Sequence, residues 1–165
     1  GRKRNPRTSF TATVNRLSRP RSTFEKSKKV YTLTVIYMIS IEHQNLVDAL
    51  IKALISQGFN VSEADSGTYP KPYAIGRHEP DIIAHAPSGL IVIGEAKTAD
   101  DFVSQRSKEQ FIDYSSRVMS SGPLRGQPTP FHIIIKKESI LDLKQVLNSI
   151  GLGNKIGSII TIWTI

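Results

Sequence analysis

Apolar residues recur at helical spacing in the segment that follows residue 40. Six of them form one stripe: Leu46, Val47, Leu50, Ile51, Leu54 and Ile55. This spacing of three and four residues predicts an amphipathic helix that packs its apolar side against a core. Ser40 is a suitable N-cap for this helix, and Gly58 is a suitable terminator.

The rest of the chain alternates between β-type runs, loops and two further helical segments. Five runs rich in β-branched and aromatic residues predict strands at 59–63, 81–86, 90–97, 131–136 and 158–165. Apolar periodicity predicts helices at about 104–119 and 139–150. The order α-β-β-β-α-β-α-β predicts an α/β fold, with a mixed β-sheet flanked by helices on both faces.

A short turn decides how the second and third predicted strands pair. Pro87-Ser88-Gly89 suits a three-residue hairpin, because proline starts a type I turn and glycine takes the left-handed position. Ala86 then faces Leu90, and Asp81 lies opposite Glu95. A turn of two or four residues would instead place Asp81 opposite a neighbour of Glu95. The prediction therefore depends on the odd length of the turn.

Three charged side chains converge on one face of this hairpin. Lys97 lies two residues after Glu95 and so projects to the same side, which Asp81 shares from across the hairpin. Facing carboxylates repel unless a cation neutralises them, and hard oxygen ligands favour Mg²⁺ or Mn²⁺. The alternative is a sheet margin where the two acids merely pair with Lys97.

This motif resembles the signature of the PD-(D/E)XK nuclease superfamily. Pro80-Asp81 is followed, after thirteen residues, by Glu95-Ala96-Lys97. The chain is also similar to archaeal Holliday-junction resolvases and small restriction-like endonucleases in three further features: Glu42, Gly58-Phe59 and Ser66-Gly67. The resemblance covers about residues 40–165.

The resemblance implies a restriction-endonuclease-like core and a metal-dependent phosphodiesterase. Asp81 and Glu95 would bind Mg²⁺, for which Mn²⁺ can substitute, together with the Ala96 carbonyl. Lys97 would position the attacking water, and Glu42 would act through a second metal or a bridging water. The products would carry 5′-phosphate and 3′-hydroxyl ends. Glu42 also precedes the column Leu46, Leu50 and Leu54 at four-residue spacing, although a Glu favoured by the helix dipole in the first turn is the alternative.

Four further residues are candidates for substrate binding. Gln110 and Tyr114 are similar to a Gln-x-x-x-Tyr feature of several nucleases in this superfamily. Lys71 and Arg77 belong to the long loop 62–80, where basic and aromatic residues alternate in a way that suits phosphates and unstacked bases. The alternatives are a core-edge Tyr114 with a surface Gln110, and a plain solvated loop.

Charge is distributed unevenly over the 165 residues. The formal net charge is +8, but residues 1–40 hold ten of the 22 Lys and Arg residues and one of the 14 Asp and Glu residues. We therefore predict a basic, disordered tail at 1–39 and a nearly neutral nuclease-like domain at 40–165. The tail is a nucleic-acid-binding arm, an organelle-targeting peptide, or a product of an over-extended reading frame preceding Met38.

Composition excludes several classes of function. The sequence contains no cysteine, which excludes disulfide scaffolds, thiolate metal sites and cysteine nucleophiles. No apolar run approaches the roughly 20 residues of a membrane span, so we expect no membrane partner. We expect an intracellular protein, cytoplasmic or nucleoid-associated unless the tail directs it to an organelle.

The sequence thus predicts a Mg²⁺-dependent DNA endonuclease, of the Holliday-junction resolvase type or a restriction or repair enzyme on duplex DNA. A homodimer is expected, because cutting two strands requires two sites. The alternative from another class is a non-catalytic nucleic-acid-binding protein that uses its basic tail.

Overall fold

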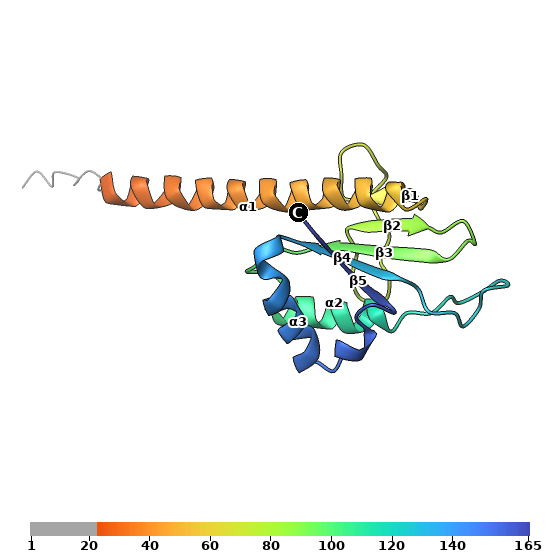
Figure 1. Ribbon diagram of the computed structural model, residues 1–165. Helices are drawn as coiled ribbons and strands as arrows, with labels where there is room; N and C mark the ends of the chain where they lie inside the picture. The colour runs from red at the N-terminus through yellow and green to blue at the C-terminus, as the bar shows by residue number, and fades with distance from the viewer. Residues whose placement is uncertain (1–22) are drawn as a thin grey trace, which may run out of the picture. The chain divides into compact units, whose positions relative to one another are not determined.

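A five-stranded sheet, with its strands arranged in sequence order, is the centre of the fold (Figure 1). The computed structural model describes residues 23–165. The strands are β1 (Asn60–Ala64), β2 (Ile82–His85), β3 (Ile91–Ala96), β4 (Phe131–Ile135) and β5 (Ile160–Thr164). β1, β2 and β3 pair antiparallel, whereas β3, β4 and β5 pair parallel. The prediction of an α/β fold with a mixed sheet is confirmed.

The helices of the described part of the chain are α1 (Thr23–Ser56), α2 (Gln105–Ser115) and α3 (Ile140–Ser149). Two short 3₁₀ helices, Lys137–Ser139 and Gly153–Lys155, were not predicted, so the order of elements differs somewhat from the expected one. α2 starts where the hydroxyl of Ser104 accepts a hydrogen bond from the Ser107 N–H, and it ends four residues earlier than expected.

Contacts divide the chain into two units between residues 35 and 36, and the sheet belongs to the second unit. Within this second unit, the part of α1 at residues 46–54 packs on one face of the sheet, and α2 and α3 cover the other (Figure 1). The strands alternate accordingly. Ile82 and Ile134 pack beneath α1, whereas Ile83 and Ile133 pack against α2 and α3. Strands buried on both faces explain the near-continuous apolar runs of the sequence.

The first helix begins at Thr23, so the prediction of a start at Ser40 is wrong. No Pro or Gly interrupts residues 23–57, and the backbone continues as one helix through Ser40 and Glu42. The amphipathic stripe is missing before Leu46 because this part of the helix packs on no core among the described residues. The apolar side chains from Val30 to Ile41 are exposed, so no buried face requires apolar residues on one side of the helix and polar residues on the other.

The predicted tail falls partly outside the described residues. Residues 23–39 are helical, which corrects the expectation of disorder there, and residues 1–22 lie outside the described part. The tail's partner and the division of the chain at residue 39 stay predictions. Within the described residues, no helix has the length and apolar character needed to cross a membrane.

A substitution of Gly94 on β3 tests how closely α1 packs on the sheet. A Cβ atom there would lie 3.0 Å from Ile82 Cβ and 3.1 Å from Leu50 Cδ2, both in the fully buried core. We expect Gly94→Ala to lower the free energy of unfolding by about 1–3 kcal/mol through overpacking. Gly67→Ala, whose Cβ would meet nothing within 4 Å, is the control. Equal denaturation midpoints for the two variants would contradict this packing.

Candidate active site

The hairpin of β2 and β3 has the register predicted from its turn. Ala86 N–H donates to Leu90 O at 2.9 Å, and Gly89 has a φ of +89°. Ile82 pairs with Gly94 and His85 with Ile91. Asp81, which directly precedes β2, therefore lies opposite Glu95, and the alternative registers are excluded.

The two carboxylates are held by the backbone of the opposite strand. Ala96 N–H donates to Asp81 Oδ2 at 2.7 Å, and Asp81 N–H donates to Glu95 Oε2 at 3.2 Å. Each carboxylate thus extends the ladder of the hairpin by one side-chain hydrogen bond. This exchange holds the two acidic groups next to each other at the end of the strands.

Lys97 connects this pair to α2. Its Nζ lies 2.8 Å from Glu95 Oε1 and donates to Gln110 Oε1 at 2.7 Å. All three residues are buried, with Glu95 2%, Lys97 9% and Gln110 3% exposed. An ammonium has three N–H donors, so one donor remains after these two bonds.

The ionisation of Glu95 reflects its surroundings. Burial raises its pKa to about 7, and the negative charge of Asp81 adds to this increase. Lys97 opposes the increase by its charge and its hydrogen bond. Desolvation therefore raises the pKa of Glu95 more than repulsion between the facing carboxylates does.

His43 on α1, rather than Glu42, faces the carboxylates. His43 Nε2 lies 3.3 Å from Asp81 Oδ2, and this interaction raises the pKa of His43 although burial opposes it. Glu42 instead pairs with Lys136 at 3.1 Å, away from Asp81. The role predicted for Glu42 at the edge of this cleft is therefore not supported.

A fuller reading of the helical periodicity identifies His43. The buried residues of α1 are Leu46, Val47, Leu50, Ile51 and Leu54. At about 100° per residue, His43 falls within roughly 10° of their mean direction, whereas Glu42 falls roughly 110° away. Glu42 continues the column Leu46, Leu50 and Leu54 beyond one edge of the buried stripe, whereas His43 lies near the centre of the stripe.

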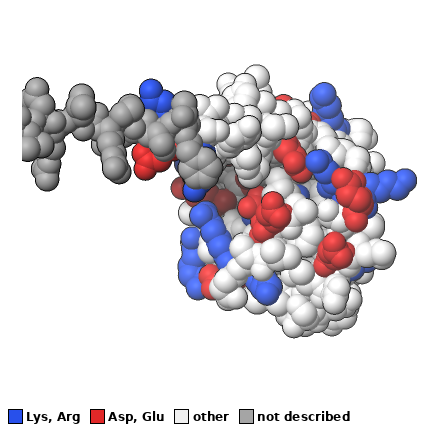
Figure 2. Space-filling view, turned by 90° about the vertical axis from the view of Figure 1, so that its left-hand side faces the viewer, with Lys and Arg blue, Asp and Glu red and all other residues white. Residues whose placement is uncertain are grey.

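These residues line a cleft of about 370 Å³. Five carboxylates line it against three Lys or Arg residues; the acidic residues are Asp65, Glu79, Asp81, Glu95 and Asp101. Lys71 lies in the same cleft but pairs with Glu79 at 2.9 Å. On the face shown in Figure 2, Lys and Arg side chains lie among Asp and Glu side chains instead of forming one continuous basic surface.

Two of the predicted substrate-binding residues lie elsewhere. Tyr114 is fully buried, does not line the cleft, and its hydroxyl has no hydrogen-bond partner among the described residues. Burial raises the pKa of Tyr114, and the charge of Glu95 raises it further. Arg77 pairs with Asp113 and lines a different cavity. Of the four candidates, only Gln110 and Lys71 line the cleft.

Within the described residues, no group of three or more His, Cys, Asp and Glu side chains is arranged to hold a metal ion. The donor set of the hairpin nevertheless suits a hard cation. It combines two adjacent carboxylates with a nearby carbonyl, and the cleft has an excess of negative charge. Comparisons with protein-family models, curated proteins and solved structures found no match.

The raised pKa of Glu95 predicts a pH dependence of stability without metal. The unfolded carboxyl titrates near 4.5 and the folded one near 7, so the contribution of Glu95 is complete below pH 4.5 and is lost as pH rises through 7. Relative to wild type, Glu95→Gln should therefore gain a few kcal/mol of stability across this range.

Chemical denaturation of both proteins in EDTA, from pH 4.5 to above 7, measures this difference. His43 also has a raised pKa and loses stabilisation as pH rises, but its main cause, the interaction with Asp81, is present in both proteins. A constant difference between the two proteins would contradict the raised pKa of Glu95.

Proposed function

We propose that the protein is a metal-dependent DNA endonuclease that hydrolyses phosphodiester bonds. The observation that carries this proposal is the Asp81–Glu95–Lys97 cluster, in which a buried lysine is held between a carboxylate and Gln110. The order of elements and the mixed sheet support a restriction-endonuclease-like core. In that core, the resemblance of the motif to PD-(D/E)XK nucleases gives these residues their roles.

Asp81, Glu95 and the Ala96 carbonyl would hold Mg²⁺. Asp81 Oδ2 is already engaged by the Ala96 N–H and by His43, which leaves Oδ1 as the oxygen for a cation. The N–H and C=O of a strand residue point to the same side, so the Ala96 carbonyl shares the side of Asp81. When bound, Mg²⁺ supplies positive charge that stabilises the attacked phosphate.

Lys97 would act on the attacking water and on the phosphate. Glu95 and Gln110 each take one of its N–H donors, and the remaining donor is available in the cleft. A fixed ammonium stabilises the negative charge that develops on phosphate oxygens in the transition state. Mg²⁺ would also offset part of the excess of carboxylates in the cleft and so favour the approach of DNA.

Replacing Lys97 tests catalysis directly. Lys97→Ala should lower Mg²⁺-dependent cleavage by at least about 10²-fold, because it removes the donor that acts on water and phosphate. Folding should persist, since Glu95 can take up a proton when its partner is lost. The assay uses plasmid, linear, single-stranded and four-way-junction DNA with Mg²⁺ or Mn²⁺.

Lys144→Ala is the matched control, because it removes the same charge from an exposed position on α3. Cleavage by Lys97→Ala at the rate of this control would contradict the assignment. DNA binding by wild type without cleavage in either metal would instead favour a non-catalytic nucleic-acid-binding protein.

Replacing Asp81 tests the metal. Mg²⁺ should raise the melting temperature of wild type as its concentration passes the dissociation constant. Asp81→Asn should shrink this response and abolish cleavage, while its stability in EDTA should equal or exceed that of wild type, because repulsion with Glu95 is removed. The exposed carboxylate of Asp142 provides the control Asp142→Asn. An equal Mg²⁺ response in Asp81→Asn and wild type would exclude Asp81 as a ligand.

A further inference from the structure

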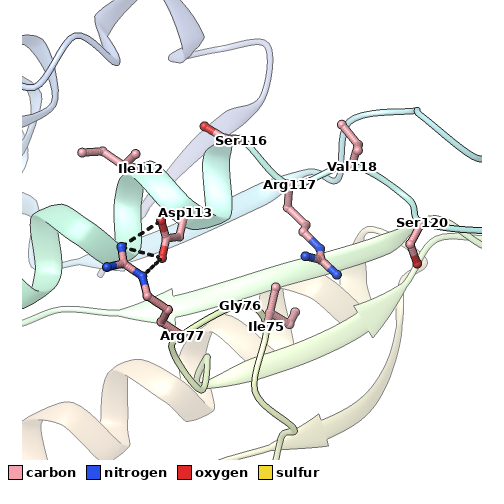
Figure 3. Close-up of a pocket in the computed structure, with 9 residues that line it drawn as sticks. All are labelled: Ile75, Gly76, Arg77, Ile112, Asp113, Ser116, Arg117, Val118 and Ser120. Carbon is pink, nitrogen blue, oxygen red and sulfur yellow. Dashed lines mark hydrogen bonds and ion pairs between the residues drawn. The ribbon is translucent and has the colours of Figure 1, made fainter.

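A second cavity, of about 480 Å³, lies beside the C-terminal half of α2 (Figure 3). Residues 75–77 of the long loop form one wall, and residues 116–120 after α2 form another. α2 lines both this cavity and the catalytic cleft. Gln110 faces the cleft, and Asp113 lines the second cavity three residues later, about 4.5 Å further along the helix axis.

One positively charged side chain of this cavity is not paired with a carboxylate of the described residues. Arg77 uses two nitrogens on the carboxylate of Asp113, at 3.2 to 3.3 Å, and so neutralises it. The Arg117 side chain is exposed and projects into the same space (Figure 3). Among residues 23–165, no carboxylate lies within ion-pair distance of its guanidinium. The lining therefore carries one unneutralised positive charge.

Apart from Ser116 and Ser120, the remaining side chains of the lining are apolar. Ile112 and Val118 are 43% and 45% exposed, although both are large hydrophobic side chains. A smaller cavity of about 80 Å³ adjoins at Arg117 and Val118, and it adds Tyr73, which is 48% exposed. A guanidinium beside exposed aliphatic and aromatic side chains matches the two parts of a nucleotide, a charged phosphate and an apolar base face.

We propose that this cavity is a subsite for an unstacked nucleotide of the DNA strand held in the catalytic cleft. Arg117 binds the phosphate of that nucleotide, and Ile112, Val118 and Tyr73 contact its base. The inference rests on the proposed nuclease function. It gives a role to Tyr73 of the loop 62–80, whose basic residues Lys71 and Arg77 are paired with carboxylates.

The test compares Arg117→Ala with Arg125→Ala. Arg125 is exposed in the loop that follows α2 and lies outside the cavity, so the two variants lose the same charge. Binding of a short fluorescein-labelled single-stranded oligonucleotide is measured in EDTA at several salt concentrations. Arg117→Ala should weaken binding and reduce the slope of log K against log salt by about 0.7, the value for one lost phosphate contact. Arg125→Ala should leave both unchanged.

The base contact is tested with Val118→Ser. This variant should weaken binding of the normal oligonucleotide but not of an abasic one, whereas the defect of Arg117→Ala should persist with both. Equal effects of Arg117→Ala and Arg125→Ala would overturn the subsite and indicate general electrostatic attraction. Failure of the wild type to cleave any DNA with Mg²⁺ or Mn²⁺ would overturn the proposed function itself, and this outcome is separate from the comparison of variants.

Discussion

The pairing of β2 with β3 brings together Asp81, Glu95 and Lys97, the cluster proposed to be catalytic. Side chains alternate along a strand, so a slip by one residue would replace Glu95 opposite Asp81 with Gly94 or Ala96. In many sheets an apolar face opposes such a slip, but Ile82 and Ile83 are both fully buried here. Burial on both faces cannot distinguish the registers. The three-residue turn, with Gly89 in the left-handed conformation, therefore determines the register of β2 and β3.

The buried Glu95–Lys97 pair is costly for stability and consistent with a functional role. Removing two charges from water is unfavourable, and their attraction offsets this only with further hydrogen bonds. Gln110 supplies one such bond to Lys97, and the Asp81 N–H supplies one to Glu95. The pKa of Glu95 still rises to about 7, so its charged form remains unfavourable. Perturbed groups of this kind in a cleft are typical of active sites.

The close contact between α1 and the sheet brings the histidine to the carboxylates. Gly94 allows Leu50 to approach β3, and His43 lies two turns before Leu50 on the same side of the helix. His43 then reaches Asp81 Oδ2, the oxygen that also accepts the Ala96 N–H. Two donors on one oxygen hold the carboxylate in a single orientation. The hairpin and the packing of α1 together therefore determine which oxygen of Asp81 faces the cleft.

The sequence by itself determined the strands, the hairpin register and the convergence of Asp81, Glu95 and Lys97. These features depend on alternation along a strand and on the chemistry of one short turn, which are local. Only the tertiary structure decided that His43 and not Glu42 faces Asp81, that Gln110 receives Lys97, and that Arg77 pairs with Asp113 outside the cleft. The extent of α1 also escaped sequence reasoning, because its exposed part packs on no core and carries no amphipathic signal. The contacts of His43 with Asp81, of Lys97 with Gln110 and of Arg77 with Asp113 each join different elements of the fold. Their geometry depends on how helices and loops pack on the sheet, and a local sequence pattern contains no information about this packing.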